Sequence, residues 1–203
     1  KPMPRAFTDQ EKAIIRERLL EQGRAFLTSY GVRRTSVEDL TRAAGISKGA
    51  FYAFFSSKEE LFFTVFEQFE AAYRQELLSM AQRAEGPPRE HLRAFLRHAI
   101  TRWRASPLFT RMGREEYDIV ARKLPPERLR AHLEDDEAFV ARLIDQWRAA
   151  GVEVASSPAE LTGLIRALFF VSLHAEEFGS ASYDATIALL IELIADHLLR
   201  PAA

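Results

Sequence analysis

The chain of 203 residues contains neither cysteine nor asparagine. Without cysteine it can form no disulfide, no thiolate zinc site, no iron–sulfur cluster and no cysteine nucleophile. Without asparagine it has no N-glycosylation sequon. These absences exclude a disulfide-stabilised scaffold and every chemistry that depends on a cysteine sulfur.

Long apolar runs are also missing. The densest apolar stretch, residues 161–173, is interrupted by a threonine, a glycine and an arginine. It therefore falls short of the roughly 18 residues that suggest a membrane-spanning helix. Near the start, Phe7 is followed by polar residues rather than by the apolar core of a signal peptide. We expect a soluble cytoplasmic protein with no membrane partner.

Charge is present in ordinary amounts but is unevenly spread. Charged residues make up 28% of the chain and hydrophobic residues 47%, which is typical of a globular protein with one or two domains. Residues 1–58 carry eleven Lys and Arg against six Asp and Glu, whereas the remaining residues carry 17 against 23. A basic head on an acidic body indicates a polyanion-binding unit attached to a module with another task.

The sequence pattern is helical throughout, because no stretch alternates convincingly with the period of two that a strand requires. Thr8 with Glu11 and Ser57 with Glu60 each fit a capping box, and Ser157 precedes a proline suited to the first helical position. Nine helices are predicted, at about 9–30, 37–44, 48–54, 58–83, 89–105, 107–123, 127–150, 158–178 and 183–199.

These helices fall into two groups. Two of those before residue 57 are too short to be stable alone, whereas the later ones are long enough to pack as a bundle. We predict an all-α protein with a three-helix N-terminal domain over residues 1–56 and a helical bundle over residues 57–203.

Residues 36–55 fit a helix-turn-helix. Apolar residues line one face of the first short helix, and Gly45 stands where a left-handed residue ends a helix without a steric penalty. Ser47 is placed to cap the second helix, and Phe51 and Phe55 to pack in the core. The second helix is then free to offer its N-terminal residues to the major groove of DNA.

Two runs extend this segment: Gly45-Ile-Ser-Lys-Gly-Ala-Phe-Tyr-Ala-Phe-Phe-Ser-Ser-Lys-Glu-Glu-Leu61 and, upstream, Thr35-Ser-Val-Glu-Asp-Leu40. Both resemble the tetracycline-repressor (TetR) family of bacterial transcription regulators. The resemblance covers residues 8–65, and beyond Leu61 only length and helical character match. It implies a DNA-binding head, a ligand-binding bundle, and a homodimer formed chiefly by the last two helices.

The resemblance and the residue chemistry together nominate DNA-contacting residues. Amides and hydroxyls at helix starts attract phosphate, lysines add point charges, and Gly49 lets the backbone approach the duplex. Base reading is left open between Lys48 on guanine, Ala50 on a thymine methyl and Glu38 on cytosine. The expected DNA-binding residues are Thr35, Ser36, Arg42, Ser47, Lys48, Gly49, Ala50, Tyr52 and Lys58.

Signals of catalysis are absent from the sequence. It contains no G-x-G-x-x-G, P-loop, G-x-S-x-G or H-E-x-x-H motif. None of the five histidines follows a glutamate by three residues, which leaves a di-iron site unsupported. His91 and His98 share a helical face, but no carboxylate lies suitably between them. We expect no enzymatic activity, no metal and no cofactor.

The bundle carries features of an interface and of a pocket. Residues 167–173 are apolar around the whole helix, and residues 187–199 bear an apolar stripe. Burial between two copies satisfies both, and a monomeric core is the alternative. Polar-tipped side chains among apolar helices are candidates to line a ligand pocket: His98, Arg102, Trp103, Tyr117, Trp147 and His174.

Together these features favour a ligand-responsive repressor. A dimer would hold two recognition helices about 34–36 Å apart on double-stranded operator DNA. An unknown small-molecule effector would change that separation through the helix that begins at Lys58. Two alternatives remain: a DNA-binding regulator or architectural protein without an effector, and an all-helical enzyme or carrier built on the same scaffold.

Overall fold

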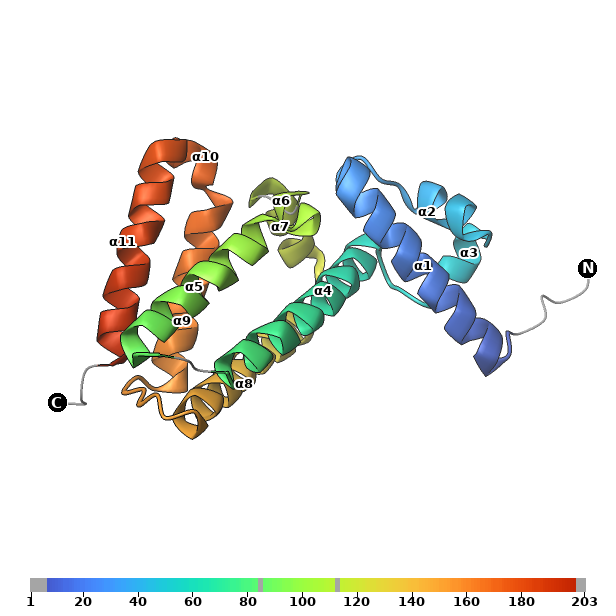
Figure 1. Ribbon diagram of the computed structural model, residues 1–203. Coiled ribbons are helices and arrows are strands. Elements are labelled where there is room, and N and C mark those ends of the chain that lie inside the picture. The colour runs from blue at the N-terminus through green and yellow to red at the C-terminus, as the bar shows by residue number, and fades with distance from the viewer. Residues whose placement is uncertain (1–6, 84–85, 112–113, 200–203) are drawn as a thin grey trace, which may run out of the picture. The chain divides into compact units, whose positions relative to one another are not determined.

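The computed structural model describes residues 7–83, 86–111 and 114–199. Within those ranges the regular secondary structure is entirely α-helical and comprises eleven helices. The predicted fold class is confirmed: a helix-turn-helix near the N-terminus is followed by a helical C-terminal part (Figure 1). A search of the described helices finds none that is both long and apolar enough to cross a membrane.

The chain forms two compact units whose boundaries differ from the predicted division at residue 57. The N-terminal unit takes in the described residues up to Phe69 together with Glu115–Leu124. The second unit comprises Glu70–Arg114 and the residues from Pro125 onward. Residues Glu115–Leu124, from the middle of the predicted bundle, therefore fold with the N-terminal unit. The division at residue 57 into a DNA-binding part and a ligand-binding part stays a prediction.

The N-terminal unit is built on strongly signalled helix ends. Thr8 and Glu11 form the predicted capping box at the start of α1, and Ser36 forms another with Asp39 at the start of α2. Its helices are α1 (Asp9–Tyr30), α2 (Val37–Ala44), α3 (Lys48–Phe51), the first half of α4 (Lys58–Ala81) and most of α7 (Arg114–Lys123). Its core includes Leu19, Leu27, Val32, Leu40, Phe51, Leu61 and Phe62, all fully buried.

The start of α4 differs from the predicted capping box. The Ser57 hydroxyl accepts the Glu60 amide at 3.1 Å, as expected. The Glu60 carboxylate, however, accepts from both the amide and the hydroxyl of Ser56, each at 2.7 Å. The reciprocal bond to Ser57 was therefore predicted one residue too late, and two serines share the cap.

The second unit is a bundle in which α8 packs against α9 and α11 packs against α5 (Figure 1). Its helices are the rest of α4, α5 (Pro88–Arg104), α6 (Pro107–Arg111), α8 (Pro126–Ala149), α9 (Pro158–Leu173), α10 (Ala175–Phe178) and α11 (Ser180–Leu198). The centre of its core is made by Leu92, Phe95, Leu143, Trp147, Leu161 and Tyr183.

One predicted helix is divided in the structure: the helix expected at 158–178 becomes α9 and α10. The helix expected at 107–123 includes α6 and α7, and residues 112–113 between them lie outside the described residues. The break between α9 and α10 has no proline or glycine to announce it. It lies beside Ser172, whose hydroxyl is 2.9 Å from the hydroxyl of Tyr183 on α11, so a contact between helices accompanies it.

Apolar surface remains on α9 and α11 of the single chain. Phe170 is 47% exposed, and Leu189 and Leu193 are 59% and 55% exposed. The expectation that residues 167–173 are buried on every side is therefore not met within one copy. Side chains of this size normally gather on a surface that another molecule covers.

Candidate nucleic-acid interface

The turn between α2 and α3 has the geometry that the sequence predicted. Gly45 adopts a left-handed conformation with φ of 71°, and the next amide, of Ile46, donates to the Thr41 carbonyl at 3.0 Å. The Ser47 hydroxyl accepts the Ala50 amide at 3.1 Å and so caps α3. Local residues alone are enough to turn the chain here.

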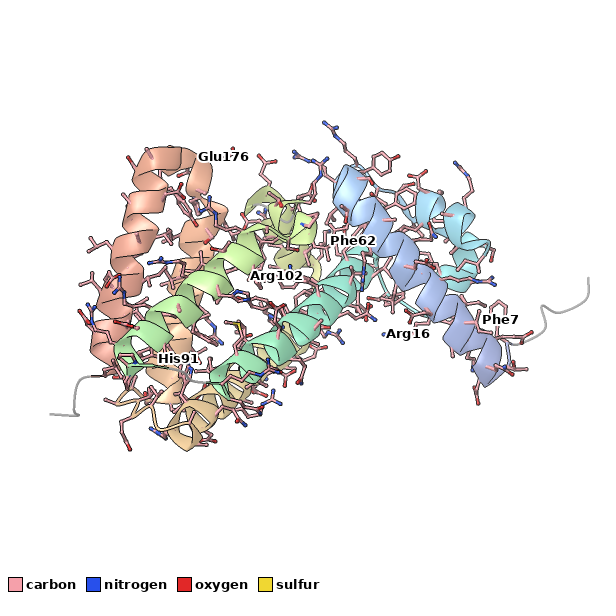
Figure 2. The ribbon with its side chains drawn as sticks, in the orientation of Figure 1. Phe7, Arg16, Phe62, His91, Arg102 and Glu176 are labelled. Carbon is pink, nitrogen blue, oxygen red and sulfur yellow. The ribbon has the colours of Figure 1, made fainter. Side chains whose placement is uncertain are left out.

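One side of α3 is anchored in the N-terminal unit. Phe51 and Phe55 are 0% and 3% exposed, and their rings lie 6.0 Å apart. The Arg16 guanidinium of α1 lies over the Phe55 ring at 5.5 Å (Figure 2). These contacts fix which way the other side of α3 faces.

That other side is open to solvent. Ser47, Lys48 and Gly49 are exposed, and Tyr52 is 52% exposed. An exposed large aromatic side chain next to a glycine and a lysine is available to a partner rather than to the core. The helix itself is shorter than predicted, ending at Phe51 instead of Phe54. Its macrodipole is correspondingly small, so the side chains carry most of the attraction for an anion.

Lys48 and Glu38 form an ion pair across the helix-turn-helix. The hydrogen bond from Lys48 lowers the pKa of Glu38 and raises that of Lys48. Both side chains are more than half exposed, so the pair adds little to stability. Two of the three side chains nominated for base reading are thus adjacent, and each holds the other in place.

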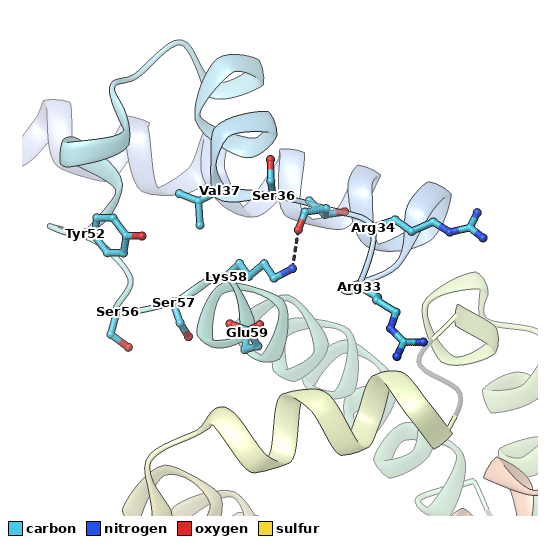
Figure 3. Close-up of a pocket in the computed structure, with 10 residues that line it drawn as sticks. Arg33, Arg34, Ser36, Val37, Tyr52, Ser56, Ser57, Lys58 and Glu59 are labelled. Atoms are coloured by element: carbon cyan, nitrogen blue, oxygen red, sulfur yellow. Dashed lines mark hydrogen bonds between the residues drawn. The ribbon is translucent and has the colours of Figure 1, made fainter.

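A hollow of about 400 Å³ lies beside α3, where the N-terminal ends of α2 and α4 come together (Figure 3). The first amides of a helix have no partner within the helix, and they favour anions. Cationic side chains and hydroxyls add to that preference. The lining residues are Arg33, Arg34, Thr35, Ser36, Val37, Tyr52, Ser56, Ser57, Lys58 and Glu59. The arrangement suits a phosphate group.

Two nominated residues turn out to hold the hollow together. Thr35 is 1% exposed and its hydroxyl donates to the Gly31 carbonyl at 2.7 Å, so its expected side-chain contact with a phosphate is wrong. Lys58 donates to the Val32 carbonyl at 2.8 Å and to the Thr35 carbonyl at 2.6 Å, the bond dashed in Figure 3. An ammonium has three N–H donors, so one remains for an anion.

The other nominated residues differ in exposure, and their contact with DNA stays a prediction. Ser36 is half-buried at the α2 cap, and Ala50 is half-buried in α3. Arg42 is 80% exposed and 3.9 Å from the Asp39 carboxylate. Sequence reasoning missed Arg33, Arg34 and Glu116. In the sequence the two arginines are typical of a solvated loop. Glu116 gives no local signal, because it contacts Val32, which lies 84 residues away in the chain.

Comparison with known proteins agrees with this geometry. Residues 19–65 match the family described as bacterial regulatory proteins, tetR family. Over nearly the whole chain the fold is similar to the crystal structure of a TetR-family transcriptional regulator from Pectobacterium atrosepticum, with a TM-score of 0.66 and 28% identity over 97% of this chain and 100% of that one. These likenesses support a regulator of the TetR type, with the family match itself confined to residues 19–65.

Other known proteins are similar to parts of the chain or to its fold. The transcriptional repressor NemR of Escherichia coli K12 is 31% identical over 88 residues, which are 43% of this chain and 44% of the repressor. The chain thus spans less than half the length of the curated relatives it matches. FadR of Thermus thermophilus, a TetR-family repressor solved in complex with lauroyl-CoA, has 24% identity and a TM-score of 0.62 over 93% of this chain and 97% of that one. This last likeness concerns the fold alone.

Three of the residues nominated for a ligand pocket gather between α4 and α5. His98 Nε2 and Arg102 Nε both contact the Glu76 carboxylate, at 2.8 and 3.3 Å. The pairing lowers the pKa of Glu76, chiefly through the His98 hydrogen bond. Trp103 packs on Tyr73 with ring centroids 5.3 Å apart. Arg102 lies on α5 (Figure 2), and the polar cluster that it forms with His98 and Glu76 lies on the same two helices as the Tyr73–Trp103 pair.

The other three lie elsewhere. Trp147 is 0% exposed and packs edge-on against Phe95 at 4.8 Å, so it is a core residue and its nomination as a pocket residue is wrong. His174 lies at the end of α9 and contacts Glu177 at 2.9 Å. Tyr117 belongs to α7 in the N-terminal unit. Helical spacing could not reveal these separations, because they depend on which helices meet.

One set of metal-ligand type occurs among the described residues of the second unit. Ligand atoms of Glu70, His132 and Asp136 all lie within 4.8 Å of one another. The Arg74 guanidinium contacts both carboxylates. The guanidinium offsets part of their charge, and Arg166 lies 3.5 Å from Asp136 as well, which makes the set part of an ion-pair network.

Proposed function

We propose that this protein is a transcriptional regulator that binds double-stranded operator DNA through its helix-turn-helix. One observation carries the proposal: α3 buries Phe51 while exposing Ser47, Lys48, Gly49 and Tyr52. A core residue and an outward polar edge on the same short helix are what insertion into a major groove requires.

The hollow beside α3 supports a division of labour in this interface. Arg33, Arg34 and the start of α2 would grip the phosphate backbone, which positions the protein without reading sequence. Lys48 and Ala50 would face base edges. Binding would draw Lys48 away from Glu38, so part of the new contact replaces an existing ion pair.

A homodimer through α9 and α11 is part of the proposal. The exposed Leu189 and Leu193 stand one helical turn apart on α11, and Phe170 is exposed on α9. A two-fold interface brings the same patch together from both copies. Two heads would then read the two halves of one operator.

A small-molecule effector bound in the second unit completes the proposed mechanism. The relative FadR is solved with lauroyl-CoA, which supports a ligand site in the corresponding helical part here. The surface around Tyr73, Trp103 and His98 supplies aromatic and polar groups for such a ligand. A coupling of about 1–3 kcal/mol between sites is enough to release DNA. We assign no catalytic step to this protein.

A regulator without an effector is the second candidate. It is favoured by the fact that His98 and Arg102 already pair with Glu76 and that Trp147 is sealed in the core. Both candidates predict the same DNA-binding behaviour.

The test is a titration of the full chain against DNA from upstream of its own gene, followed by electrophoretic mobility and fluorescence anisotropy. Specific binding that survives excess competitor DNA is the expected result. Absence of specific binding at low salt would refute the regulator. A metabolite panel that includes acyl-CoA thioesters is then added to the complex. Release by a panel member supports the ligand-responsive form, whereas release by none favours the second candidate.

A further inference from the structure

The turn between α1 and α2, residues 31–35, is held from the side of α4. The Lys58 ammonium donates to the carbonyls of Val32 and Thr35, and the Thr35 hydroxyl donates to the Gly31 carbonyl. Val32 itself is fully buried. The Gly31 amide donates to carbonyls of α1 and the Thr35 amide to the Val32 carbonyl, whereas the Val32 and Arg33 amides find their acceptor in a more distant part of the chain.

Those amides are met by Glu116 of α7. One carboxylate oxygen accepts the Val32 amide at 2.7 Å and the Arg33 amide at 3.1 Å. Hydrogen bonds from backbone amides to an ionised carboxylate are roughly twice as strong as neutral ones. The neighbouring Glu115 contacts the Arg33 side chain at 3.2 Å, and both groups are largely exposed. Glu116 therefore fixes the backbone of the turn, while Glu115 touches only its surface.

Gly31 makes the approach of Glu116 possible. Its φ of 79° lies in the left-handed region. A Cβ atom at this position would stand 2.6 Å from the Glu116 carboxylate, closer than real Cβ contacts come. The position of the Glu116 carboxylate therefore requires that residue 31 have no side chain.

Helix α7, which carries Glu116, comes from a part of the sequence whose neighbours on both sides fold in the other unit. Glu115–Leu124 folds with the N-terminal unit, although the chain on both sides of it, to Arg114 and from Pro125, belongs to the second unit. The turn that Glu116 holds leads directly into Arg33, Arg34 and Ser36, which line the hollow beside α3.

We propose that Glu116 is a positioning residue for DNA binding: by capping the Val32 and Arg33 amides it holds the phosphate-facing turn in its binding geometry. The proposal rests on the proposed function and deepens it. A residue from the middle of the effector part of the chain thereby sets the affinity of the DNA-binding head. Glu116 itself touches no DNA.

The test compares four full-length variants: Glu116→Ala, Glu116→Gln, Gly31→Ala and the double variant Gly31→Ala/Glu116→Ala. Glu116→Ala should lose about ten-fold or more in DNA affinity. Glu116→Gln keeps an acceptor oxygen and should recover most of it. The double variant should bind DNA no more weakly than whichever of Gly31→Ala and Glu116→Ala has the lower affinity, because alanine at position 31 already displaces the Glu116 carboxylate. Glu115→Ala is the matched control and should change affinity by less than about two-fold.

Hydrogen exchange provides a readout that needs no DNA. In Glu116→Ala the amides of Val32 and Arg33 should exchange faster, while α8 and α11 keep wild-type protection. Any of three results would overturn the positioning role of Glu116. They are wild-type DNA affinity in Glu116→Ala, losses of affinity that multiply in the double variant, and unchanged exchange at the Val32 and Arg33 amides. If the wild-type chain binds no DNA, the proposed function fails, and the exchange result still decides whether Glu116 holds the turn.

Discussion

At the scale of single residues, the interface depends on side chains that are committed to one another before DNA arrives. Lys48 is paired with Glu38, and Lys58 with two backbone carbonyls. Lys48 is exposed and can change partner, whereas Lys58 is needed to shape the turn. We therefore expect replacement of Lys48 to affect chiefly DNA binding, and replacement of Lys58 to affect chiefly the folded structure of the turn.

Replacing Lys48 tests this distinction. Lys48→Ala should weaken operator binding and reduce the slope of log affinity against log salt concentration by about one, because one phosphate-neutralising cation is lost. Anisotropy titrations at several salt concentrations measure both quantities. Lys12→Ala, which removes an exposed lysine paired with Asp9 on α1, should leave both unchanged. Equal affinity and slope for Lys48→Ala would remove this residue from the interface.

At the scale of helices, the close packing of α1 against α4 depends on Gly23. A Cβ atom there would lie 3.1 Å from Leu61 and 3.3 Å from Val65, both fully buried. Sequence reasoning treats a glycine inside a helix as a loss of about 1 kcal/mol relative to alanine. The structure gives it a purpose, since the two helices approach where the side chain is missing.

Gly23→Ala should therefore destabilise the protein in spite of better helix propensity. Overpacking of a buried contact costs about 1–3 kcal/mol, which exceeds the propensity gain of about 1 kcal/mol. Gly163→Ala on α9, where an added Cβ meets nothing within 4 Å, is the matched control and should gain stability. Chemical denaturation measures both free energies of unfolding. A higher free energy of unfolding for Gly23→Ala would mean that the Leu61 side chain can move aside without losing its packing energy.

Helix caps make stability depend on pH. Hydrogen bonds from Ser36 lower the pKa of Asp39, and bonds from the cap residues Thr8 and Ser157 lower the pKa of Glu11 and Glu160. A carboxylate whose pKa is lowered by folding stabilises the protein above its unfolded pKa, and that contribution is lost as the pH falls through the folded value.

The unfolding temperature should accordingly fall as the pH drops below about 5, because unfolded carboxyl groups titrate at about 4 and the folded values of these three lie lower. Asp39→Asn should start less stable at pH 6 and lose less on acidification, since one of the titrating caps is gone. Thermal unfolding followed by circular dichroism across this range measures the effect. An identical pH profile for Asp39→Asn and the wild type would show that this cap does not contribute.

At the scale of the whole molecule, the proposed homodimer would cover the apolar surface of α9 and α11. Leu189→Glu with Leu193→Glu should convert a dimer to a monomer, because two charges would be buried at a two-fold contact. Light scattering coupled to size exclusion measures the mass. Leu133→Glu, at an exposed leucine on α8, is the control and should leave the mass unchanged. A dimer that survives the double substitution would place the interface elsewhere.

The sequence by itself determined the helix-turn-helix. Gly45, the caps at Ser36 and Ser47, and the buried Phe51 and Phe55 interact within about twenty residues, so local pattern and turn chemistry were enough to predict them. The same local rules predicted most helix bounds and the all-α class.

Only the tertiary structure decided how that motif is held. Glu116 caps the turn from 84 residues away, and the hollow exists because α2 and α4 begin side by side. Thr35 and Trp147, which look like contact residues in sequence, are buried by helices that the local pattern does not place. Capping and turn formation are set by neighbours along the chain, whereas burial and long-range hydrogen bonds are set by which helices meet.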